Sequence, residues 1–567
     1  MEEPSKQKPK RKRHNVVTFK PYVQNQAWLL PPTLGELIPA DHLCRLVNDA
    51  IDGMELEPIL NTYEGGGSSS YHPRMMLKAL VYGYVDKKYS SREIEQALKE
   101  NICYMWLCGM QRPDHNTLNR FRNSRLKQTV KDVFAQVLAM LVEQGYVRLE
   151  EYYVDGTKIE SVAGRYTFVW AKNVKRYKEA LLDKIAAIID QIERVNEQTE
   201  AEAREKEAQT MRPAVSDSEA LKQTIAELNK NLKERLGENK KTASQLQKLE
   251  SEHLPRLMHY EEQERLLDGR NSYAKTDPDA TFMRTKDDHR GTGSLKPCYN
   301  ILLGTDNQFI LNATVHQTPS DLACFKTHMD STLTMLEKTS LPKPKRCSGD
   351  AGFGSEENYE YLEDKHIEAY LKYPGYQQKS NKYKESAFHH SNLYYNKEKD
   401  FYVCPMGQHM TLRCIRTAKT NTGYKQKVHY YQAQRCEGCP LRGMCHSAKG
   451  ERVLRINHRA AAYRKAAKER LDSEQGLKMR SQRGVDTEPV FGHIKQCRHF
   501  RRFLLKGIQG VMTEVSLLAI AHNLKKWWTQ QCKQGRGVSN RLLDKATRVQ
   551  MEPKSSQMTL IFERTKA

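Results

Sequence analysis

Apolar residues recur at two different spacings along the chain, and the change of spacing divides it into helix-rich and strand-rich segments. Between residues 14 and about 147 the apolar positions lie three or four apart, as in HPRMMLKALVYGYVDK (72–87), which predicts amphipathic helices. SSREIEQALKE (90–100) adds a serine cap with a glutamate in the first turn. DHNTLNRFRNSRLKQ follows, with Asp114 placed to cap another helix. This part of the chain therefore predicts a compact helical unit.

The last two of these helices suggest a DNA-binding element. Two short helices joined by a turn, the second polar and basic, are typical of a helix-turn-helix that enters a major groove. The second helix would present Asn116, Arg120 and Arg122 to DNA. The alternative is a helical bundle that only supports the rest of the chain.

Strand patterns begin near residue 148. YYVDGTKIES (152–161) predicts a strand with Asp155 near its end, and CYNILLGTDNQFILNATVHQ (298–317) predicts a hairpin around a Thr-Asp-Asn turn. A helix over about 320–337 leads to a further strand that ends at Asp350, and Ser355 is placed to cap the next helix. The order β-β-β-α-β-α predicts a mixed α/β core.

Two segments interrupt this core. Residues 172–268 are rich in Ala, Glu, Lys, Leu and Gln with helical spacing, which predicts an antiparallel helical hairpin or short coiled coil. A dimer contact, a DNA contact and a solvated spacer all remain open for it. The predicted divisions are a disordered basic arm (1–13), a helical domain (14–147), the core (148–171, 270–375 and 456–530), the helical hairpin (172–268), a Cys-rich insertion (376–455) and a C-terminal tail (531–567).

Three acidic residues stand in settings that suit catalysis. Asp155 and Asp350 each end a short apolar run and are followed by a glycine or a Gly-rich turn, and Glu488 opens a helical segment with Pro489 in its first turn. Carboxylates of this kind can form an oxygen-only site for Mg²⁺ or Mn²⁺. Two such ions activate a water or a 3′-hydroxyl and stabilise the leaving oxygen of a phosphodiester. Asp306 and Asp321 are the competing carboxylates, and we interpret them as hairpin and helix-start residues.

The chain resembles the DDE transposases of bacterial insertion sequences. The phrases that carry the resemblance are PDHNTLNRFR (113–122), VDGTKIES (154–161), GDAGFGSEENYEYL (349–362) and EPVFGHIKQCRHFRRFLLKG (488–507). The resemblance implies a ribonuclease-H-like catalytic core with a mixed sheet and flanking helices. It also implies an enzyme that cuts at element ends and joins 3′-hydroxyls to target DNA, with Asp155, Asp350 and Glu488 as the catalytic, metal-binding triad.

The resemblance extends to the residues around Glu488, with one departure. Lys495 lies seven positions after Glu488, as in related transposases, and is a candidate phosphate contact. Those relatives place an arginine four residues before the glutamate and a tyrosine three before that. Here Arg483 lies five residues before and no tyrosine is near, so Asp486 is a rival for the third ligand. Further candidates for DNA contact are Arg483, Arg498, Arg501 and Arg502, with a solvated helix face as the alternative.

Four of the thirteen cysteines form a group. Cys436-x₂-Cys439 can grip a tetrahedral metal, and Cys445 and the distant Cys404 can complete a structural zinc site. His446 or Cys414 could replace one ligand. Reduced thiols without metal, and a redox role, are the alternatives. The resemblance implies a similar cysteine pattern between the second aspartate and the glutamate.

Composition agrees with a nucleic-acid partner. Lys and Arg number 92 against 69 Asp and Glu, a formal net charge of +23, which favours a polyanion. No long apolar run or signal peptide is present, so we expect a soluble, cytoplasmic, nucleoid-associated protein. The expected partners are double-stranded DNA, as terminal inverted repeats and target, and a second copy of the chain. A catalytically inactive DNA-binding protein derived from a transposase and a ribonuclease-H-like nuclease remain the rival interpretations.

Overall fold

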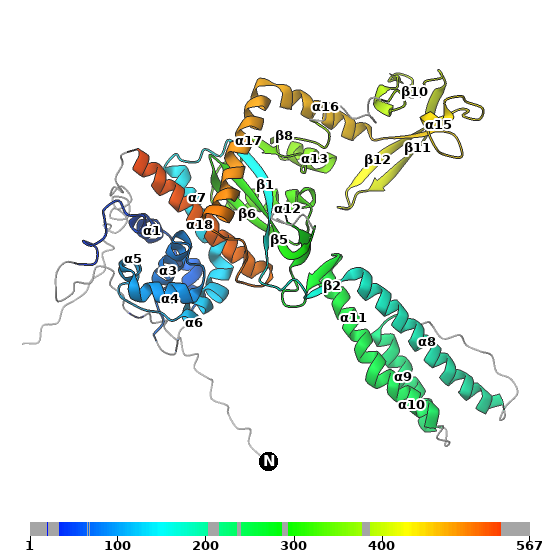
Figure 1. The fold of residues 1–567 in the computed structure, drawn as a ribbon, viewed down its shortest axis with the longest axis horizontal. Coiled ribbons are helices and arrows are strands. Elements are labelled where there is room, and N and C mark those ends of the chain that lie inside the picture. The colour runs from blue at the N-terminus through cyan, green and yellow to red at the C-terminus, as the bar shows by residue number, and fades with distance from the viewer. Residues whose placement is uncertain are drawn as a thin grey trace, which may run out of the picture.

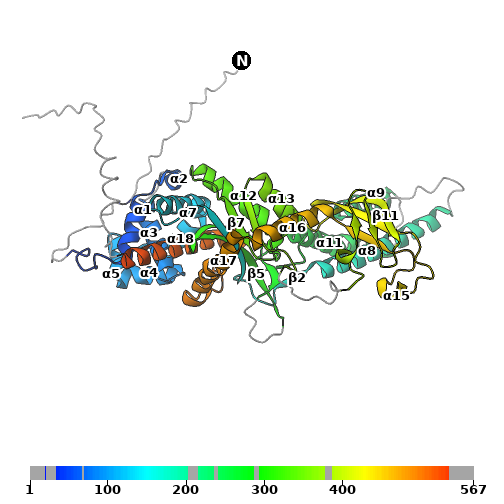
Figure 2. The ribbon, with the colours of Figure 1, turned by 90° about the horizontal axis from the view of Figure 1, so that it is seen from above.

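The computed structural model describes residues 20, 33–64, 66, 69–201, 215–234, 240–285, 293–376 and 386–534. The predicted arm over 1–13 lies outside the described residues, as does the predicted tail except for residues 531–534. An α/β core lies between a helical N-terminal unit on one side and two extensions on the other (Figures 1 and 2).

The core is a mixed sheet, as predicted. β1 (Glu151–Glu160) pairs antiparallel with β5 (Leu295–Asp306), which pairs antiparallel with β6 (Phe309–His316). On the other side of β1, β7 (Arg346–Gly349) and β8 (Glu368–Leu371) run parallel to it, and β4 (Thr281–Arg284) pairs with the first residues of β5. The order β6-β5-β1-β7-β8, antiparallel and then parallel, is the ribonuclease-H-like arrangement, so the predicted fold class is confirmed.

Helices cover both faces of this sheet. Tyr152 of β1 contacts His328 of α12 (Asp321–Lys338), and α13 (Glu356–Asp364) packs beside α12 on the same face. Alternate residues of β1, namely Tyr153, Asp155 and Thr157, face α17 (Glu474–Gly492) and α18 (Gly507–Lys533). The alternation follows from the pleat of a strand, which points successive side chains to opposite faces.

The N-terminal unit is helical. It contains α1 (Leu43–Asp52), α2 (Glu57–Leu60), α3 (Pro73–Val85), α4 (Ser91–Glu100), α5 (Ile102–Leu107), α6 (His115–Arg120), a π-helical turn η1 (Phe121–Arg125) and α7 (Leu126–Glu143). Ser90 and Glu93 form the predicted capping box, and Asp114 accepts a hydrogen bond from Thr117 N at 2.7 Å. The caps read from the sequence therefore start the helices where they were expected.

α18 joins the N-terminal unit to the sheet. It packs on α3 and α7 on one side and on β6 on the other. Its buried Glu514 accepts hydrogen bonds from Leu504 N and Leu505 N, both at 2.9 Å, and from Tyr84 OH in α3 at 3.1 Å. Asn523 pairs with both the N–H and the C=O of Ile310 at 2.8 Å, and so satisfies backbone groups of the edge strand β6.

The helical insertion differs from the predicted two-helix hairpin. Between β2 (Phe168–Trp170) and β3 (Ser272–Ala274) lie α8 (Ala171–Ala201), α9 (Ser218–Glu234) and a continuous segment of α10 (Lys240–Lys248), η2 (Leu249–His253) and α11 (Leu254–Leu267). Ser218 contacts Glu261 near the end of α11, so α9 starts close to the core and runs outward. Leu221, Ile225 and Leu228 give α9 its own apolar stripe, which explains why three helical segments pack together.

The Cys-rich insertion forms a second sheet. Its strand order is β13 (Val453–Ile456), β12 (Lys425–Ala433), β11 (His409–Lys419), β10 (Phe401–Val403) and β9 (Tyr395–Asn396), and all pairs are antiparallel. A short helix η3 (His390–Asn392) precedes the sheet, α15 (Arg442–Cys445) lies between β12 and β13, and α16 (His458–Asp472) leads back to α17. α16, α17, the π-helical η4 (His493–Cys497) and α18 complete the core.

Candidate active site and cysteine cluster

Strand register places Asp155 and Asp350 side by side. β1 and β7 are parallel, with Val154 opposite Gly349, so the next residue of each strand is one of the two aspartates. Neighbouring strands lie about 4.8 Å apart, which brings the two residues within reach of a shared ligand. The sequence predicted that Asp155 lies near the end of its strand. This prediction was wrong, because β1 continues to Glu160 along β5.

The two aspartates also have similar local support. Gly156 N donates to Asp155 Oδ1 and Gly352 N donates to Asp350 Oδ1, each at 2.8 Å. Each carboxylate is therefore oriented by a backbone N–H.

Gly156 separates the site from a competing carboxylate. A Cβ at Gly156 would lie 2.7 Å from Asp321 Oδ1, on the face of the sheet that α12 covers. Asp155 points to the opposite face, because successive strand residues alternate. Asp306 is also structural, since its Oδ2 accepts hydrogen bonds from Arg148 N at 3.2 Å and Leu149 N at 3.3 Å. Asp306 therefore lies at the β5–β6 hairpin and Asp321 at the start of α12, as the sequence predicted.

α17 runs along β1 and brings cationic groups to the aspartates. Tyr153 OH lies 3.5 Å from Met479 Sδ, and Arg483, one helical turn later, donates from Nη1 to Asp155 Oδ2 at 3.2 Å. The two side chains of this ion pair are only 14% and 19% exposed. The Nε atom of Arg483 is buried without a hydrogen-bond partner among the described residues.

Glu488 and Asp486 lie on opposite flanks of α17. Arg480, Gly484 and Glu488 are four apart and share one flank, and a Cβ at Gly484 would lie 3.9 Å from Glu488 Oε1. Arg480 contacts the ring of Tyr376, beyond β8. Glu488 is exposed on this flank. The carboxylate oxygens of Asp155, Asp350 and Glu488 do not all lie within 4.8 Å of one another in this structure.

Asp486 faces the other way. It is buried, and its Oδ1 accepts a hydrogen bond from Gln308 N at 3.0 Å in the turn between β5 and β6. Burial raises the pKa of Asp486. The rival third ligand is therefore held by the fold on the far side of the helix from Glu488.

A further cation stands next to the carboxylates. Burial lowers the pKa of Lys372, the first residue after β8, and the nearby charges of Arg483 and Arg480 lower it further, while Asp350 opposes the shift. Lys372 and Arg480 were not singled out in the sequence, because nothing in the local pattern around either residue marks it. Only the packing of β8 and α17 brings Lys372 close to Asp350 and Arg480 close to Lys372.

Two arginines predicted to contact DNA are buried instead. Arg498 is 1% exposed and donates to the carbonyl oxygens of Tyr84 and Val85, at the end of α3. Arg122 is 3% exposed and donates to Tyr89 O at 2.9 Å and Asn119 Oδ1 at 3.1 Å. Both guanidiniums are used to satisfy backbone carbonyls between packed elements, so these two predictions are corrected.

The other basic candidates lie nearer to solvent. Asn116 and Arg120 are exposed on α6, and Arg501 is exposed and hydrogen-bonded to Gln496 at 2.8 Å. Arg502 donates to Ser161 O at 2.9 Å and Ala163 O at 3.0 Å, which links the chain after η4 to the end of β1. Lys495 lies half-buried within the π-helical turn η4, which changes the helical register after Glu488.

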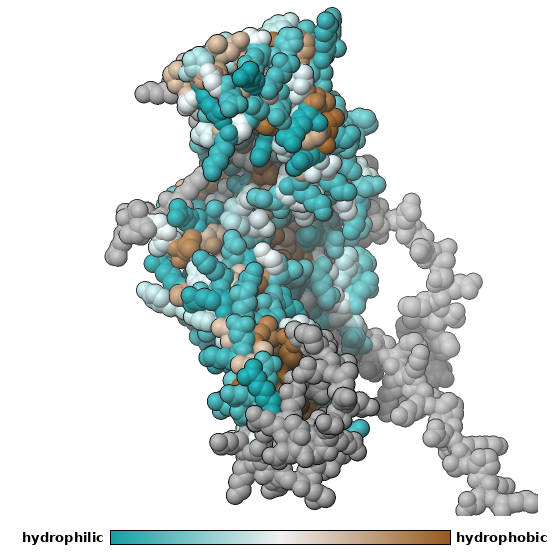
Figure 3. Space-filling view, turned by 90° about the vertical axis from the view of Figure 1, so that its right-hand side faces the viewer, coloured by the Kyte–Doolittle hydropathy of each residue, from teal (hydrophilic) through white to brown (hydrophobic). Residues whose placement is uncertain are grey.

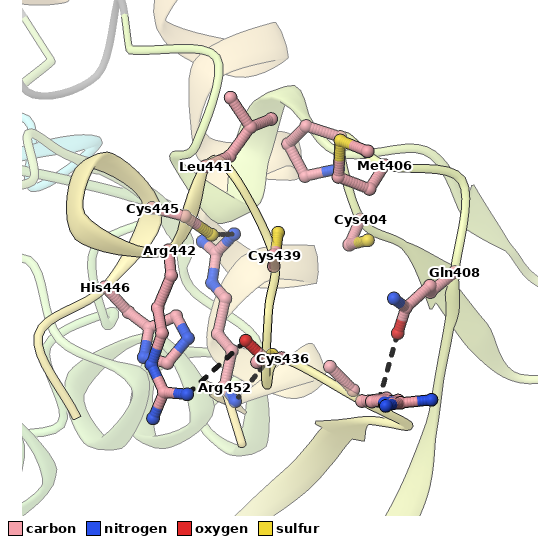
Figure 4. Close-up of a pocket in the computed structure, with 13 residues that line it drawn as sticks. Cys404, Met406, Gln408, Cys436, Cys439, Leu441, Arg442, Cys445, His446 and Arg452 are labelled. Carbon is pink, nitrogen blue, oxygen red and sulfur yellow. Dashed lines mark hydrogen bonds between the residues drawn. The ribbon is translucent and has the colours of Figure 1, made fainter. Parts of the chain in front are cut away.

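The four predicted cysteine ligands surround one small cavity (Figure 4). Cys404, Cys436, Cys439 and Cys445 line it together with His446 and Arg452, and its volume of about 20 Å³ has room for one water-sized sphere. Both ring nitrogens of His446 are buried without a hydrogen-bond partner among the described residues. Cys414, the other alternative ligand, does not line the cavity.

The cysteine sulfurs lie too far apart in this structure to coordinate one ion together. No three of these four sulfurs all lie within 4.8 Å of one another. Arg452 occupies part of the space: its Nη1 donates to Cys445 Sγ at 3.0 Å and its backbone N to Cys436 Sγ at 3.4 Å. The donor set and the unsatisfied imidazole nevertheless suit a thiophilic ion such as Zn²⁺.

A second cluster of this kind lies in the N-terminal unit. Ligand atoms of His42, Cys44 and Cys103 all lie within 4.8 Å of one another. His42 also caps α1, because its Nδ1 accepts a hydrogen bond from Cys44 N at 3.2 Å. Cys44 and Cys103 lie far apart along the chain, so only the packing of α1 and α5 brings them together.

Two family models match parts of the chain. Residues 32–124 match the family described as "Transposase domain (DUF772)", and residues 403–528 match the family described as "Transposase DDE domain". The first covers most of the N-terminal helices, and the second runs from β10 through Glu488 into α18. No curated protein and no solved structure matches the chain. Among the described residues, no helix is both long and apolar enough to cross a membrane.

Proposed function

Because the chain is a DDE transposase of the insertion-sequence type, we propose that it cuts DNA at the ends of its own element and joins the released 3′-hydroxyl to target DNA. The observation that carries this proposal is the parallel register of β1 and β7, which sets Asp155 beside Asp350. The helix that bears Glu488, α17, contacts Asp155 through Arg483. In the proposal, three carboxylates from three distant parts of the chain would meet at one metal site on this side of the core.

Each of these residues has a distinct task in the proposal. Asp155, Asp350 and Glu488 would hold two Mg²⁺ or Mn²⁺ ions, for which carboxylate oxygens are the preferred donors. When bound, such ions supply activation of the attacking oxygen and stabilisation of the leaving oxygen. The backbone donors Gly156 N and Gly352 N fix one oxygen of each aspartate, and the other oxygen of Asp155 accepts a hydrogen bond from Arg483.

The neighbouring cations would hold the substrate. Arg483, Arg480 and Lys372 form a positive group beside the aspartates, and a scissile phosphate supplies the anion that such a group favours. Arg483 is suited to exchange partners, because it pairs with Asp155 at 3.2 Å and keeps a buried Nε unused. A phosphate that entered the site would offer it a second acceptor.

We also propose roles for the flanking units. The exposed Asn116 and Arg120 of α6 would contact the element's terminal inverted repeats, with α4 packed against α6 as its supporting helix although α5 lies between them in the chain. Cys404, Cys436, Cys439 and Cys445 would bind a structural Zn²⁺, with His446 as the substitute for one of them. Since two element ends must be joined in one reaction, the active form would be at least a dimer on DNA.

The test is metal-dependent cleavage and joining of a duplex that carries the flanks of the gene. Asp155→Asn, Asp350→Asn and Glu488→Gln are expected to abolish cutting while DNA binding survives. Asp321→Asn is the matched control, because Asp321 lies against Gly156 but on the other face of the sheet, and this variant should still cut.

The outcomes separate the rival functions. Cleavage without strand-joined products would leave a ribonuclease-H-like nuclease. Specific binding of the flanks without cutting, in the unaltered protein with Mg²⁺ or Mn²⁺, would leave a DNA-binding protein derived from a transposase. Loss of cutting in Asp321→Asn as well as in the triad variants would contradict the assignment of the site.

A further inference from the structure

The second sheet has one face that its own core does not cover. On β11, β12 and β13 the side chains of Met410, Tyr431, Leu454 and Ile456 point inward and are buried. The alternate positions point outward, and among them are Arg413, Arg416 and Arg455, all exposed. We name these three residues, with Tyr430 between them, the arginine face.

The arginine face is held in place by contacts within the sheet. Arg455 stands directly opposite Tyr430 in the ladder, and Arg416 lies on the neighbouring strand. Their guanidinium carbons lie 5.7 Å and 5.4 Å from the centroid of the Tyr430 ring, within the range of a cation–π contact. Arg413, at the bulge in β11, donates to Gln432 Oε1 at 3.0 Å. The three cations are therefore presented together and partly ordered before any ligand arrives.

No neighbouring acid neutralises this face. Residues 401–436 contain six Lys or Arg and no Asp or Glu. Within the described part of the chain, none of the three arginines forms an ion pair with a carboxylate. Figure 3 views the side of the molecule that carries this sheet, and hydrophilic side chains predominate there over small separate hydrophobic groups. This chemistry suits a polyanion rather than an apolar protein partner.

The ribbon β11–β12 is fastened to the catalytic core beside Asp350. Its turn contacts α13, where Thr422 donates to Glu357 Oε2 at 2.6 Å and Tyr424 OH donates to Glu360. Ser355, five residues after Asp350, caps this helix. Asn457, just after β13, also donates to Glu356 at 2.6 Å. The arginine face thus belongs to a unit that is anchored on the helix following Asp350.

We propose that the arginine face binds the phosphate backbone of duplex DNA that extends away from the active site. This inference rests on the proposed function, since it assumes that DNA enters beside Asp350. Arginine suits the task because its planar guanidinium recognises phosphate oxygens with two parallel hydrogen bonds. A contact of this kind carries no base sequence, so it would position the DNA and leave sequence recognition to other residues.

The experiment measures the binding of end-bearing duplexes without divalent metal, by fluorescence anisotropy over a range of salt concentrations. The variant Arg413→Gln/Arg416→Gln/Arg455→Gln is compared with the unaltered protein on duplexes of increasing length beyond the element end. A plot of log affinity against log salt has a negative slope. Each lost phosphate contact makes this slope shallower by about 0.9, so the loss of three contacts makes it shallower by about 2.7. The weakening should appear only once the duplex is long enough to reach the ribbon.

Two further proteins sharpen the test. The Lys substitutions at the same three positions keep the charge and should retain most of the salt slope. Lys175→Gln/Lys222→Gln/Arg265→Gln removes the same charge from the exposed surface of the helical insertion and should leave the slope unchanged. An unchanged slope in the first variant, or an equal loss in this control, would overturn the proposal. Cleavage of a short substrate, lost in Asp350→Asn but kept in the arginine variant, would show that the proposed function stands independently.

Discussion

Arg483 Nη1 donates a hydrogen bond to Asp155 Oδ2 at 3.2 Å, and this pair joins α17 to the central strand of the core. The two residues come from opposite ends of the catalytic region, with both insertions between them in sequence. The pair explains how a helix at the end of the core is held over an aspartate at its beginning. It also gives Asp155 a cationic partner before any metal is bound.

Arg483→Gln should reduce cleavage by about 10- to 100-fold. The variant loses a charge-assisted hydrogen bond, which contributes about 1.5–3 kcal/mol, and each 1.36 kcal/mol corresponds to about tenfold in rate. Single-turnover cleavage of an end-bearing duplex measures the effect. Arg459→Gln is the control, because Arg459 forms an ion pair with Glu360 at the surface of α13, away from Asp155. Equal losses in the two variants would contradict a specific role for Arg483.

Glu488→Gln and Asp486→Asn should have opposite outcomes. Glu488 is exposed on α17, and its loss should slow cleavage by more than about 100-fold, since even loss of a ligand's supporting partner can cost that much. The Asp486→Asn side chain can still accept from Gln308 N, so cleavage should persist. Parallel rate measurements decide between the two, and an inactive but folded Asp486→Asn protein would make Asp486 the third ligand.

Asp306→Asn should stabilise the protein at neutral pH but not at acidic pH. Burial raises the pKa of Asp306 to about 6, and the charges of Asp486 and Glu151 act in the same direction. A raised carboxyl pKa means that stability is fully present below the unfolded value of about 3.9 and is lost as the pH rises through about 6. Asparagine does not ionise, so the variant does not lose this stability. At 1.36 kcal/mol for each pKa unit, its gain in free energy of unfolding at neutral pH is at most roughly 2–3 kcal/mol.

Urea unfolding of both proteins at intervals between pH 4.5 and 7.5 measures this difference. The curves should converge at the acidic end and separate as the pH rises. An advantage of the variant that does not change with pH would show that ionisation of Asp306 is not its cause.

The cysteine cluster should bind one zinc ion per chain. Cys436→Ser and Cys439→Ser remove lining residues of the cavity and should lower both the zinc content and the melting temperature of the insertion. Cys414→Ser is the matched control, because Cys414 lies on β11 but does not line the cavity. Elemental analysis of the purified protein and thermal unfolding with and without a chelator provide the readout. Equal zinc content in all four proteins would exclude this site.

Gly156→Ala should impair both folding and cleavage. The added Cβ would lie 2.7 Å from Asp321 Oδ1, so either the Asp321 carboxylate must leave its hydrogen bond from Asn300 Nδ2 or β1 must shift, at a cost of about 1–3 kcal/mol. Any shift of β1 also moves Asp155. Gly443→Ala, where a Cβ would meet nothing within 4 Å, should be neutral in the same unfolding and cleavage assays. A Gly156→Ala protein with unaltered stability would show that the close approach is not required.

Several local features were predictable from sequence because their causes are local. The Ser90 capping box, the Asp114 cap and the hairpin turn before Gln308 depend on side chains within a few residues of the backbone groups that they serve. The strand-turn-helix around Asp350 was predictable for the same reason, since Ser355 N-caps α13. The family resemblance supplied the ribonuclease-H-like topology, which spacing did not distinguish from other mixed sheets.

Other features depended on contacts between distant segments. The burial of Arg122 and Arg498 follows from the packing of α3 against η1 and the chain after η4, and a basic run in the sequence looks the same whether its members face water or backbone carbonyls. The sequence predicted helices in the insertion but not their number or packing, because the arrangement of α9 between α8 and α11 depends on contacts between residues far apart in the chain.

The sequence by itself determined the helical and strand segments, the positive charge, the cysteine spacing and the identity of the three acidic residues, because each of these is a property of neighbouring positions. Only the tertiary structure decided which face of the sheet Asp155 occupies, that Asp486 is hydrogen-bonded to Gln308 in the β5–β6 turn, and that Lys372 lies close to Asp350. The physical reason is that strand register and helix packing set the distance between residues far apart in the chain, and the strength of an ion pair or ligand set depends on that distance.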